Sequence, residues 1–192
     1  DKGSVEVYHG SDMGLGDTAA WARNGSSYKE QFGWCVACAG DVNGDGFSEI
    51  IVGVPNHFDE YTEEGAAHVF KGGSEGIVGE EPWWSVSPAD QSFARCGHSV
   101  ACAGDVNADG YDDVIIGAPN YTSGFDYEGS GWVFLGSSDG LSTSQDWFRV
   151  SGHEGAKFGY SVASAGDVNG DGYCDVIVGA PGHTGSFTNE VG

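Results

Sequence analysis

The amino-acid sequence predicts an all-β fold of four-stranded antiparallel blades, the architecture of a β-propeller. Three observations lead to this fold class: one unit is repeated three times, each unit contains four short segments of strand character, and no segment keeps a helical period. Glycine is frequent, at 34 of 192 residues, which is typical of many short strands joined by tight turns. Antiparallel four-stranded units repeated at a fixed period are the blades of propellers.

The repeat is most evident at three acidic segments. "GDVNGDGFSEI" begins at Gly40, "GDVNADGYDDV" at Gly104 and "GDVNGDGYCDV" at Gly166. Small residues precede each segment, and a β-branched run that ends in Gly-Val-Pro or Gly-Ala-Pro follows it. We therefore expect a single domain over residues 1–192, with repeats at approximately 3–64, 65–128 and 129–192.

Each repeat supplies four strands in the same order. Typical examples are residues 158–165 for the first strand, 175–179 for the second, 132–134 for the third and 146–150 for the fourth. The chain opens on counterparts of the third and fourth strands and closes after counterparts of the first and second. The sequence thus predicts two continuous blades and one blade split between the termini.

A tryptophan marks the fourth strand of each repeat, at Trp21, Trp84 and Trp147. An aromatic stripe of this kind could bind a ligand. Its regular recurrence favours packing, because each blade must fill the same wedge against its neighbour.

The acidic segments predict calcium sites. With Asp41, Asp105 and Asp167 counted as position one, oxygen-bearing side chains occupy positions one, three, five and nine of each loop. Position six is glycine (Gly46, Gly110, Gly172), which permits the positive φ of a sharp turn. That turn can aim the position-seven carbonyl inward. An all-oxygen set with two or three carboxylates suits Ca²⁺. The expected ligands are Asp41, Asn43, Asp45, Phe47 (carbonyl) and Glu49; Asp105, Asn107, Asp109, Tyr111 (carbonyl) and Asp113; and Asp167, Asn169, Asp171, Tyr173 (carbonyl) and Asp175.

Two other interpretations of these loops are less favourable. An EF-hand requires a glutamate at position twelve, where this chain has Val52, Ile116 and Val178. Ordinary acidic hairpin turns also use Asp-Gly, but the same oxygen ligands recur at the same places in all three loops. The first loop carries Glu49 where the others have aspartate, so its geometry is expected to differ most.

Composition restricts the class of partner. The chain has 29 acidic and 7 basic residues and a formal charge of −22, so nucleic acid and anionic lipid are poor partners. The sequence contains no run of about 18 apolar residues, so membrane insertion is not predicted. Cys35 and Cys38 form a lone C-x-x-C without a second pair at zinc spacing, and the five cysteines are expected to be small buried residues.

The combined motif resembles the FG-GAP repeat of integrin α-chain propellers. Phe32-Gly33 and Phe158-Gly159 precede the acidic loops, and Gly117-Ala118-Pro119 and Gly179-Ala180-Pro181 follow them. The resemblance covers nearly the whole chain and implies a calcium-binding, usually extracellular β-propeller used in adhesion, in ligand binding or as an accessory module. Cys96 departs from the expected Phe and Val54 from the expected Ala. Integrin propellers have seven such repeats, so no integrin ligand specificity is carried over.

Three repeats alone would give a strained ring, which suggests a partner. Two chains could exchange half-blades to make a six-bladed ring with two-fold symmetry, or an open version of the exchange could give a filament. Alternatively, the chain belongs to a longer propeller.

The expected function is a calcium-binding extracellular module for adhesion or structural assembly, without catalysis. No catalytic or phosphate-binding motif occurs. His57 and His183 occupy equivalent places and are interpreted as solvated loop histidines, with ligand contact as the alternative. The polar, aromatic loops 56–64 and 120–128 favour a second hypothesis, a lectin-like or protein-binding fragment of a larger propeller. An accessory domain of a secreted enzyme is a further possibility.

Overall fold

A computed structural model describes residues 2–58 and 62–185 of the chain. These residues form fourteen strands and no helix, so no helix in the described ranges is long and apolar enough to span a membrane. Two complete blades occupy the centre. The first contains β5 (Cys35–Gly40), β6 (Glu49–Val54), β7 (Ala66–Phe70) and β8 (Trp84–Val86), and the second contains β9 (Ser99–Gly104), β10 (Asp113–Ala118), β11 (Ser130–Phe134) and β12 (Trp147–Val150).

Two-stranded sheets flank the complete blades. β1 (Ser4–Val7) pairs with β4 (Trp21–Asn24), and β13 (Ser161–Gly166) pairs with β14 (Asp175–Gly179). They correspond to the third and fourth strands and to the first and second strands of a blade, as predicted. A small hairpin that the sequence pattern does not predict, β2 (Gly10–Ser11) with β3 (Gly14–Leu15), extends from the sheet of β1 and β4. The predicted all-β blades are thereby confirmed.

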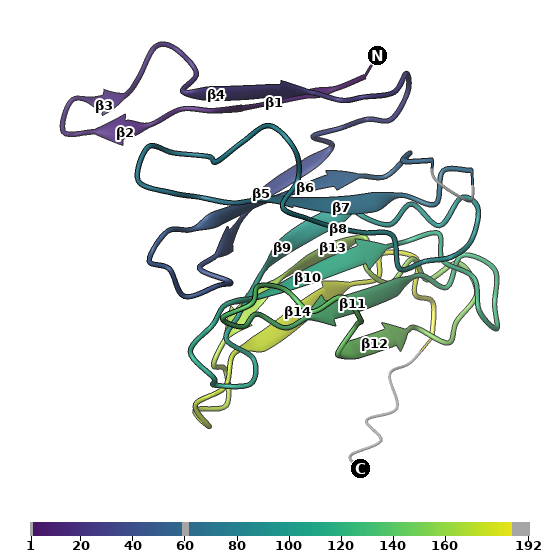
Figure 1. Cartoon of the computed structure of the whole chain (residues 1–192). Helices are drawn as coiled ribbons and strands as arrows, with labels where there is room; N and C mark the ends of the chain where they lie inside the picture. Colours follow the sequence, from purple (N-terminus) through teal and green to yellow (C-terminus); the bar gives the residue numbers. More distant parts are fainter. Residues whose placement is uncertain (1, 59–61, 186–192) are drawn as a thin grey trace.

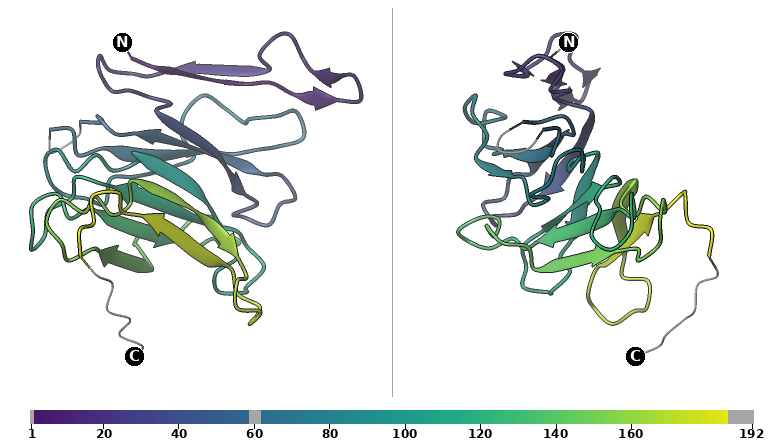
Figure 2. Two further views of the ribbon diagram at one scale, coloured as in Figure 1. Left: turned by 180° about the vertical axis from the view of Figure 1, so that it is seen from behind. Right: turned by 90° about the vertical axis from the view of Figure 1, so that its right-hand side faces the viewer.

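The sheets stack face to face in chain order, from the N-terminal pair to the C-terminal pair (Figures 1 and 2). The first strands of successive blades, β5, β9 and β13, are neighbours along one side of the stack. Pairing registers agree between the complete blades: Val52 of β6 lies opposite Val36 and His68, and Ile116 of β10 lies opposite Val100 and Trp132. The sequence repeat is therefore a structural repeat.

The apolar core lies between blades. Alternate residues of the second strand point to opposite faces of the sheet, so Ile51 packs toward the second blade while Val52 and Val54 pack toward the N-terminal sheet. Ile51 and Ile115 are fully buried, whereas the equivalent Ile177 of β14 is 59% exposed. Burial in this chain therefore depends on a neighbouring blade on each face.

The recurrent tryptophans serve this packing. Trp21 lies 5.1 Å from Phe70 and Trp84 lies 5.1 Å from Phe134, ring centroid to ring centroid, each across a blade junction. Their indole N–H groups donate to the carbonyls of Gly79 and Ser142, both at 3.1 Å. The packing interpretation is confirmed for both residues.

The glycines of the repeat motif allow adjacent blades to approach closely. A Cβ on Gly53 would collide with the carbonyl of Gly97, and one on Gly117 would collide with the carbonyl of Gly159. In both cases a glycine near the end of the second strand of one blade faces the glycine that precedes the first strand of the next. The glycines of the motif thus form backbone contacts between blades.

The expected burial of the cysteines is only partly correct. All five are free thiols; Cys96 is buried, Cys35, Cys102 and Cys174 are half-buried, and Cys38 is exposed. Cys38 lies on β5, whose alternate side chains face the open side of the stack rather than another sheet.

Candidate metal centres

The three acidic loops share one conformation. Each joins the first two strands of a sheet, and each begins at an irregularity in their pairing, at Gly40, Gly104 and Gly166. Position six has φ of +87° at Gly46, +93° at Gly110 and +95° at Gly172. The positive φ predicted for this glycine is confirmed in every loop.

The position-one aspartate holds the turn together. In the second loop the amides of Asp109 and Gly110 donate to the two carboxylate oxygens of Asp105, at 3.0 and 2.8 Å. The Asp109 amide also donates to the side-chain oxygen of Asn107 at 3.1 Å. Asp41 and Asp167 receive the same bonds in their loops. The oxygens at positions one and three therefore converge on one amide.

The position-nine carboxylate lies beneath the loop. Glu49 and Asp113 are fully buried, and Asp113 accepts from the amides of Val106 at 2.7 Å and Gly136 at 2.8 Å. Burial raises the pKa of Asp113 to about 6, with added repulsion from Asp109 and Asp105 outweighing these hydrogen bonds. Burial likewise raises the pKa of Glu49. Each of these two loops thus concentrates carboxylates whose negative charge a divalent cation would neutralise.

The first loop differs from the others, as its glutamate suggested. Lys71 places its ammonium group 3.0 Å from Oδ2 of Asp45, and this ion pair lowers the pKa of Asp45. The second repeat has Leu135 at the position of Lys71. Asn43 donates to Glu49 at 3.0 Å, whereas Asn107 and Asn169 donate to the aspartates at position five. A lysine therefore competes with any cation in the first loop.

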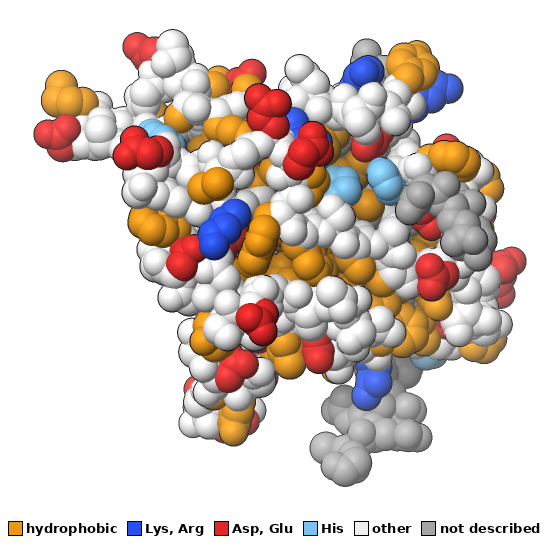
Figure 3. Space-filling view, in the orientation of Figure 1, with side chains coloured by type: hydrophobic (Ala, Val, Ile, Leu, Met, Phe, Trp, Pro, Cys, Tyr) orange, Lys and Arg blue, Asp and Glu red, His pale blue; other side chains and the backbone are white. Residues whose placement is uncertain are grey.

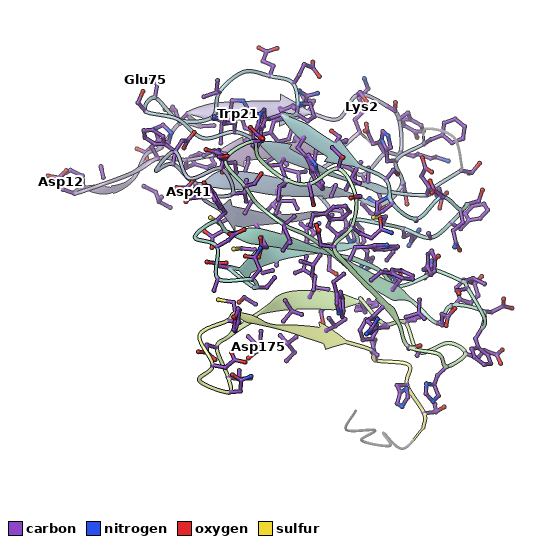
Figure 4. The ribbon with its side chains drawn as sticks, turned by 60° about the horizontal axis from the view of Figure 1, so that its bottom comes forward. Lys2, Asp12, Trp21, Asp41, Glu75 and Asp175 are labelled. Atoms are coloured by element: carbon purple, nitrogen blue, oxygen red, sulfur yellow. The ribbon has the colours of Figure 1, made fainter. Side chains whose placement is uncertain are left out.

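The loops gather at one end of the stack and contact one another. Asp41 and Asp175, from the first and third loops, lie at the same end of the sheets (Figure 4). The amide of Asp112 donates to the Asp41 carbonyl at 3.2 Å, and the amide of Cys174 donates to the Asp105 carbonyl at 3.0 Å. The row of loops therefore ties neighbouring blades together.

A different set of side chains forms the tightest candidate cluster. Among the described residues, Glu30, His57 and His68 are the one group of three His, Cys, Asp or Glu side chains whose ligand atoms all lie within 4.8 Å of one another. Within the described ranges the loop carboxylates form no such group; their oxygens accept hydrogen bonds from backbone amides. The loops fit Ca²⁺ through their all-oxygen chemistry and their charge, with the amide oxygen of Asn at position three as a further donor.

Only His57 of this cluster is singled out by the sequence, as a residue of a solvated loop. The structure corrects that interpretation: His57 is half-buried, its Nδ1 lies 3.4 Å from Oε1 of Glu30, and its ring meets that of His68 edge-on at 5.6 Å. Burial lowers the pKa of His68 to about 4. Burial also acts to raise the pKa of Glu30, but bonds from Ser27, Ser26 and His57 outweigh it and leave that pKa below its ordinary value.

Comparison of the repeats could have revealed this cluster. Glu30 stands where the other repeats have Ala94 and Ala156, and His68 stands where the second repeat has Trp132. A charged residue at an otherwise apolar position is the signal that the sequence offered.

Known proteins share this repeat. The FG-GAP repeat family matches residues 36–70, 99–134 and 158–191. The chain is 35% identical to integrin alpha-4 of Xenopus laevis over 170 residues, 85% of this chain and 16% of that protein. It is 34% identical to integrin alpha-PS3 of Drosophila melanogaster over 167 residues, 82% of this chain and 14% of that protein.

Integrin alpha pat-2 of Caenorhabditis briggsae is 38% identical over 157 residues, 73% of this chain and 12% of that protein. The chain thus spans less than a fifth of the length of each of these relatives. The matched segments coincide with the acidic loops and the strands around them. This chain belongs to the FG-GAP repeat family of β-propeller proteins, and its repeats are integrin-like.

Proposed function

We propose that the protein is an extracellular, calcium-stabilised β-propeller module of adhesion or structural assembly, without catalytic activity. The observation that carries the proposal is the row of three acidic loops with matching hydrogen bonds at one end of the stacked blades. Three Ca²⁺ ions would be held by the side chains at positions one, three, five and nine, with the carbonyls of Phe47, Tyr111 and Tyr173. Bound Ca²⁺ supplies positive charge that neutralises the clustered carboxylates.

Adhesion is supported by the kinship with integrin α chains. The same kinship supports the proposed extracellular location, and calcium sites of this type suit a medium rich in free Ca²⁺. Because the chain covers only a small part of its relatives, the partner proposed first is the remainder of a longer propeller. Exchange of the β1–β4 and β13–β14 sheets between two chains, or along a filament, is the self-association to be tested beside it.

Calcium dependence is tested by thermal unfolding in Ca²⁺ and in a chelator. A site filled at 100 times its Kd stabilises the fold by about 2.7 kcal/mol, so chelation should lower Tm clearly. Asp105→Asn should lose part of this stabilisation, because it removes a carboxylate from the second loop. The control, Asp139→Asn, removes an exposed carboxylate in a turn outside the loops and should behave like the wild type. An unchanged Tm on chelation would overturn the proposal.

Light scattering of the same samples tests assembly. A Ca²⁺-dependent dimer would support exchange of half-blades, whereas a monomer with a stable fold would exclude it. The unfolding experiment tests the calcium sites whichever oligomeric state light scattering finds.

A second candidate function, binding of a protein or glycan, is favoured by the loop between β10 and β11. Phe125 is 50% exposed and Tyr127 is 53% exposed on this loop. Buried Glu128 organises it by accepting from the amides of Ser123 at 2.6 Å and Gly124 at 2.7 Å. Exposed aromatics on an ordered loop are typical of recognition sites. A glycan array with Phe125→Ala as the comparison tests it; binding by neither or equally by both would count against this loop.

A further inference from the structure

The first complete blade replaces an aromatic cluster of its sister blade with polar residues. In the second blade, Tyr121, Trp132 and Phe148 contact one another with ring centroids 5.4–5.7 Å apart. The equivalent residues of the first blade are His57, His68 and Ser85, and Glu30 stands in place of Ala94. At four equivalent positions the first blade therefore carries polar side chains, three of which can bind a metal ion, where the second blade carries three aromatic rings and an alanine.

Hydrogen bonds already orient two of the three side chains, His68 and Glu30. Ser85 Oγ lies 2.8 Å from Nδ1 of His68, so a metal ion would be bound through the other ring nitrogen, Nε2. The Ser27 amide donates to Oε2 of Glu30 at 2.7 Å, and the Ser26 hydroxyl donates to the same oxygen at 3.1 Å. Outer partners of this kind fix the orientation of metal ligands in proteins.

The cluster is both enclosed and reachable. Glu30 is 4% exposed, and it lines a pocket of about 200 Å³ together with both histidines, Arg23 and Glu81. Arg23 is ion-paired with Glu81 at 3.1 Å, and its guanidinium lies 5.3 Å from the Phe70 ring centroid. Its charge is therefore partly compensated. Histidine side chains lie next to acidic ones on the face seen in Figure 3.

We infer that Glu30, His57 and His68 form a binding site for a divalent transition-metal ion of the Zn²⁺ class. Two imidazole nitrogens and one carboxylate oxygen are a ligand set that Zn²⁺ takes in proteins, with water in the remaining position. Ca²⁺ and Mg²⁺ prefer all-oxygen shells and would not select this site. The site is therefore chemically distinct from the acidic loops.

The position of the cluster gives the ion a structural consequence. Glu30 belongs to the segment that passes from β4 of the N-terminal sheet to β5 of the first blade, His57 follows β6, and His68 lies on β7. A shared ion would connect the crossing segment to two strands of the blade. Asn56 already donates to the Lys29 carbonyl at 3.1 Å across the same junction.

The test is calorimetric titration of the protein with Zn²⁺ in saturating Ca²⁺, which occupies any sites in the acidic loops. The wild type should bind one Zn²⁺ through this cluster. His57→Ala and His68→Ala should each weaken that binding at least tenfold. Retention of wild-type affinity in either variant would overturn the assignment.

A fourfold variant distinguishes loss of the metal site from loss of the fold. Glu30→Ala, His57→Tyr, His68→Trp and Ser85→Phe together give the first blade the residues of the second, so this variant should fold, keep its response to Ca²⁺ and bind no Zn²⁺ at the cluster. If it still binds Zn²⁺ like the wild type, the site lies elsewhere.

Two controls address other side chains that could bind Zn²⁺. His153 and His183 form a second histidine pair, with ring centroids 4.4 Å apart, but Ala156 replaces the glutamate there. Cys38 is an exposed thiol. His153→Ala and Cys38→Ser should both bind Zn²⁺ as the wild type does. Loss of binding in either control would place the ion outside the proposed cluster.

Discussion

At the residue scale, the acidic loops contain a second left-handed position besides the glycine at position six. Position four has φ of +70° at Gly44, +58° at Ala108 and +76° at Gly170. A side chain with Cβ is strained in this conformation by roughly 1–2 kcal/mol. The sequence did not indicate this strain, because alanine occupies the position in one loop of three.

This position gives a reciprocal pair of substitutions. Ala108→Gly should raise the free energy of unfolding by up to about 1 kcal/mol, since relief of strain exceeds the extra freedom of the unfolded chain. Gly170→Ala should lower it by about as much; its Cβ would have open space, so only the backbone is tested. Urea unfolding in saturating Ca²⁺ measures both. Effects of the opposite signs would show that the loops do not keep this conformation in solution.

His98 links stability to pH. Its ring lies between those of Trp34, at 5.7 Å, and Tyr160, at 4.8 Å, in a row formed by equivalent residues of three repeats. Burial lowers its pKa; a backbone bond with Tyr160 opposes this, and the charges of Arg95 and Lys157 reinforce it. The folded pKa is below the unfolded value of 6.5, so the unfolded chain binds the proton more readily.

The contribution of His98 is therefore complete above pH 6.5 and is lost as the pH falls below that value. His98→Tyr, which introduces the residue of the third repeat, should show a smaller loss of unfolding free energy between pH 7.5 and 5.5 than the wild type. Identical losses in the two proteins would exclude His98 as a source of the pH dependence.

At the scale of the elements, the strands and their order could be predicted from the sequence. The expected segments 175–179 and 146–150 correspond to β14 (Asp175–Gly179) and β12 (Trp147–Val150). Short β-branched runs between glycine and acidic turns identify such strands locally. The β2–β3 hairpin was missed because its two-residue strands carry no such run. The Glu30–His57–His68 cluster was missed because it unites a linker, a turn and a strand.

The three acidic loops should not bind calcium equally. The Lys71–Asp45 ion pair must be broken or displaced when a cation enters the first loop, so this site should be the weakest. Lys71→Leu, which introduces the residue of the second repeat, should tighten binding at that site severalfold and leave the other two unchanged. Calcium titration followed by calorimetry measures this difference. Three identical sites in the wild type, unaffected by the substitution, would contradict the role given to Lys71.

At the scale of the whole molecule, the fold is a row of sheets whose stability lies in the junctions. The junctions on the two sides of the second blade combine a core of apolar side chains, glycine-to-glycine backbone contacts and hydrogen bonds between acidic loops. The repeat predicted from sequence fixes which residues meet at each junction. The number of blades in a closed ring does not follow from the repeat, because each junction involves only nearest neighbours.

The central claim is that each acidic loop holds one calcium ion, and native mass spectrometry counts them directly. The protein sprayed from a Ca²⁺-containing solution should carry three ions per chain and lose them to a chelator. Asp41→Asn, Asp105→Asn and Asp167→Asn should each reduce the count by one. A chain that carries no specifically bound calcium, or a count that none of these substitutions changes, would contradict the account.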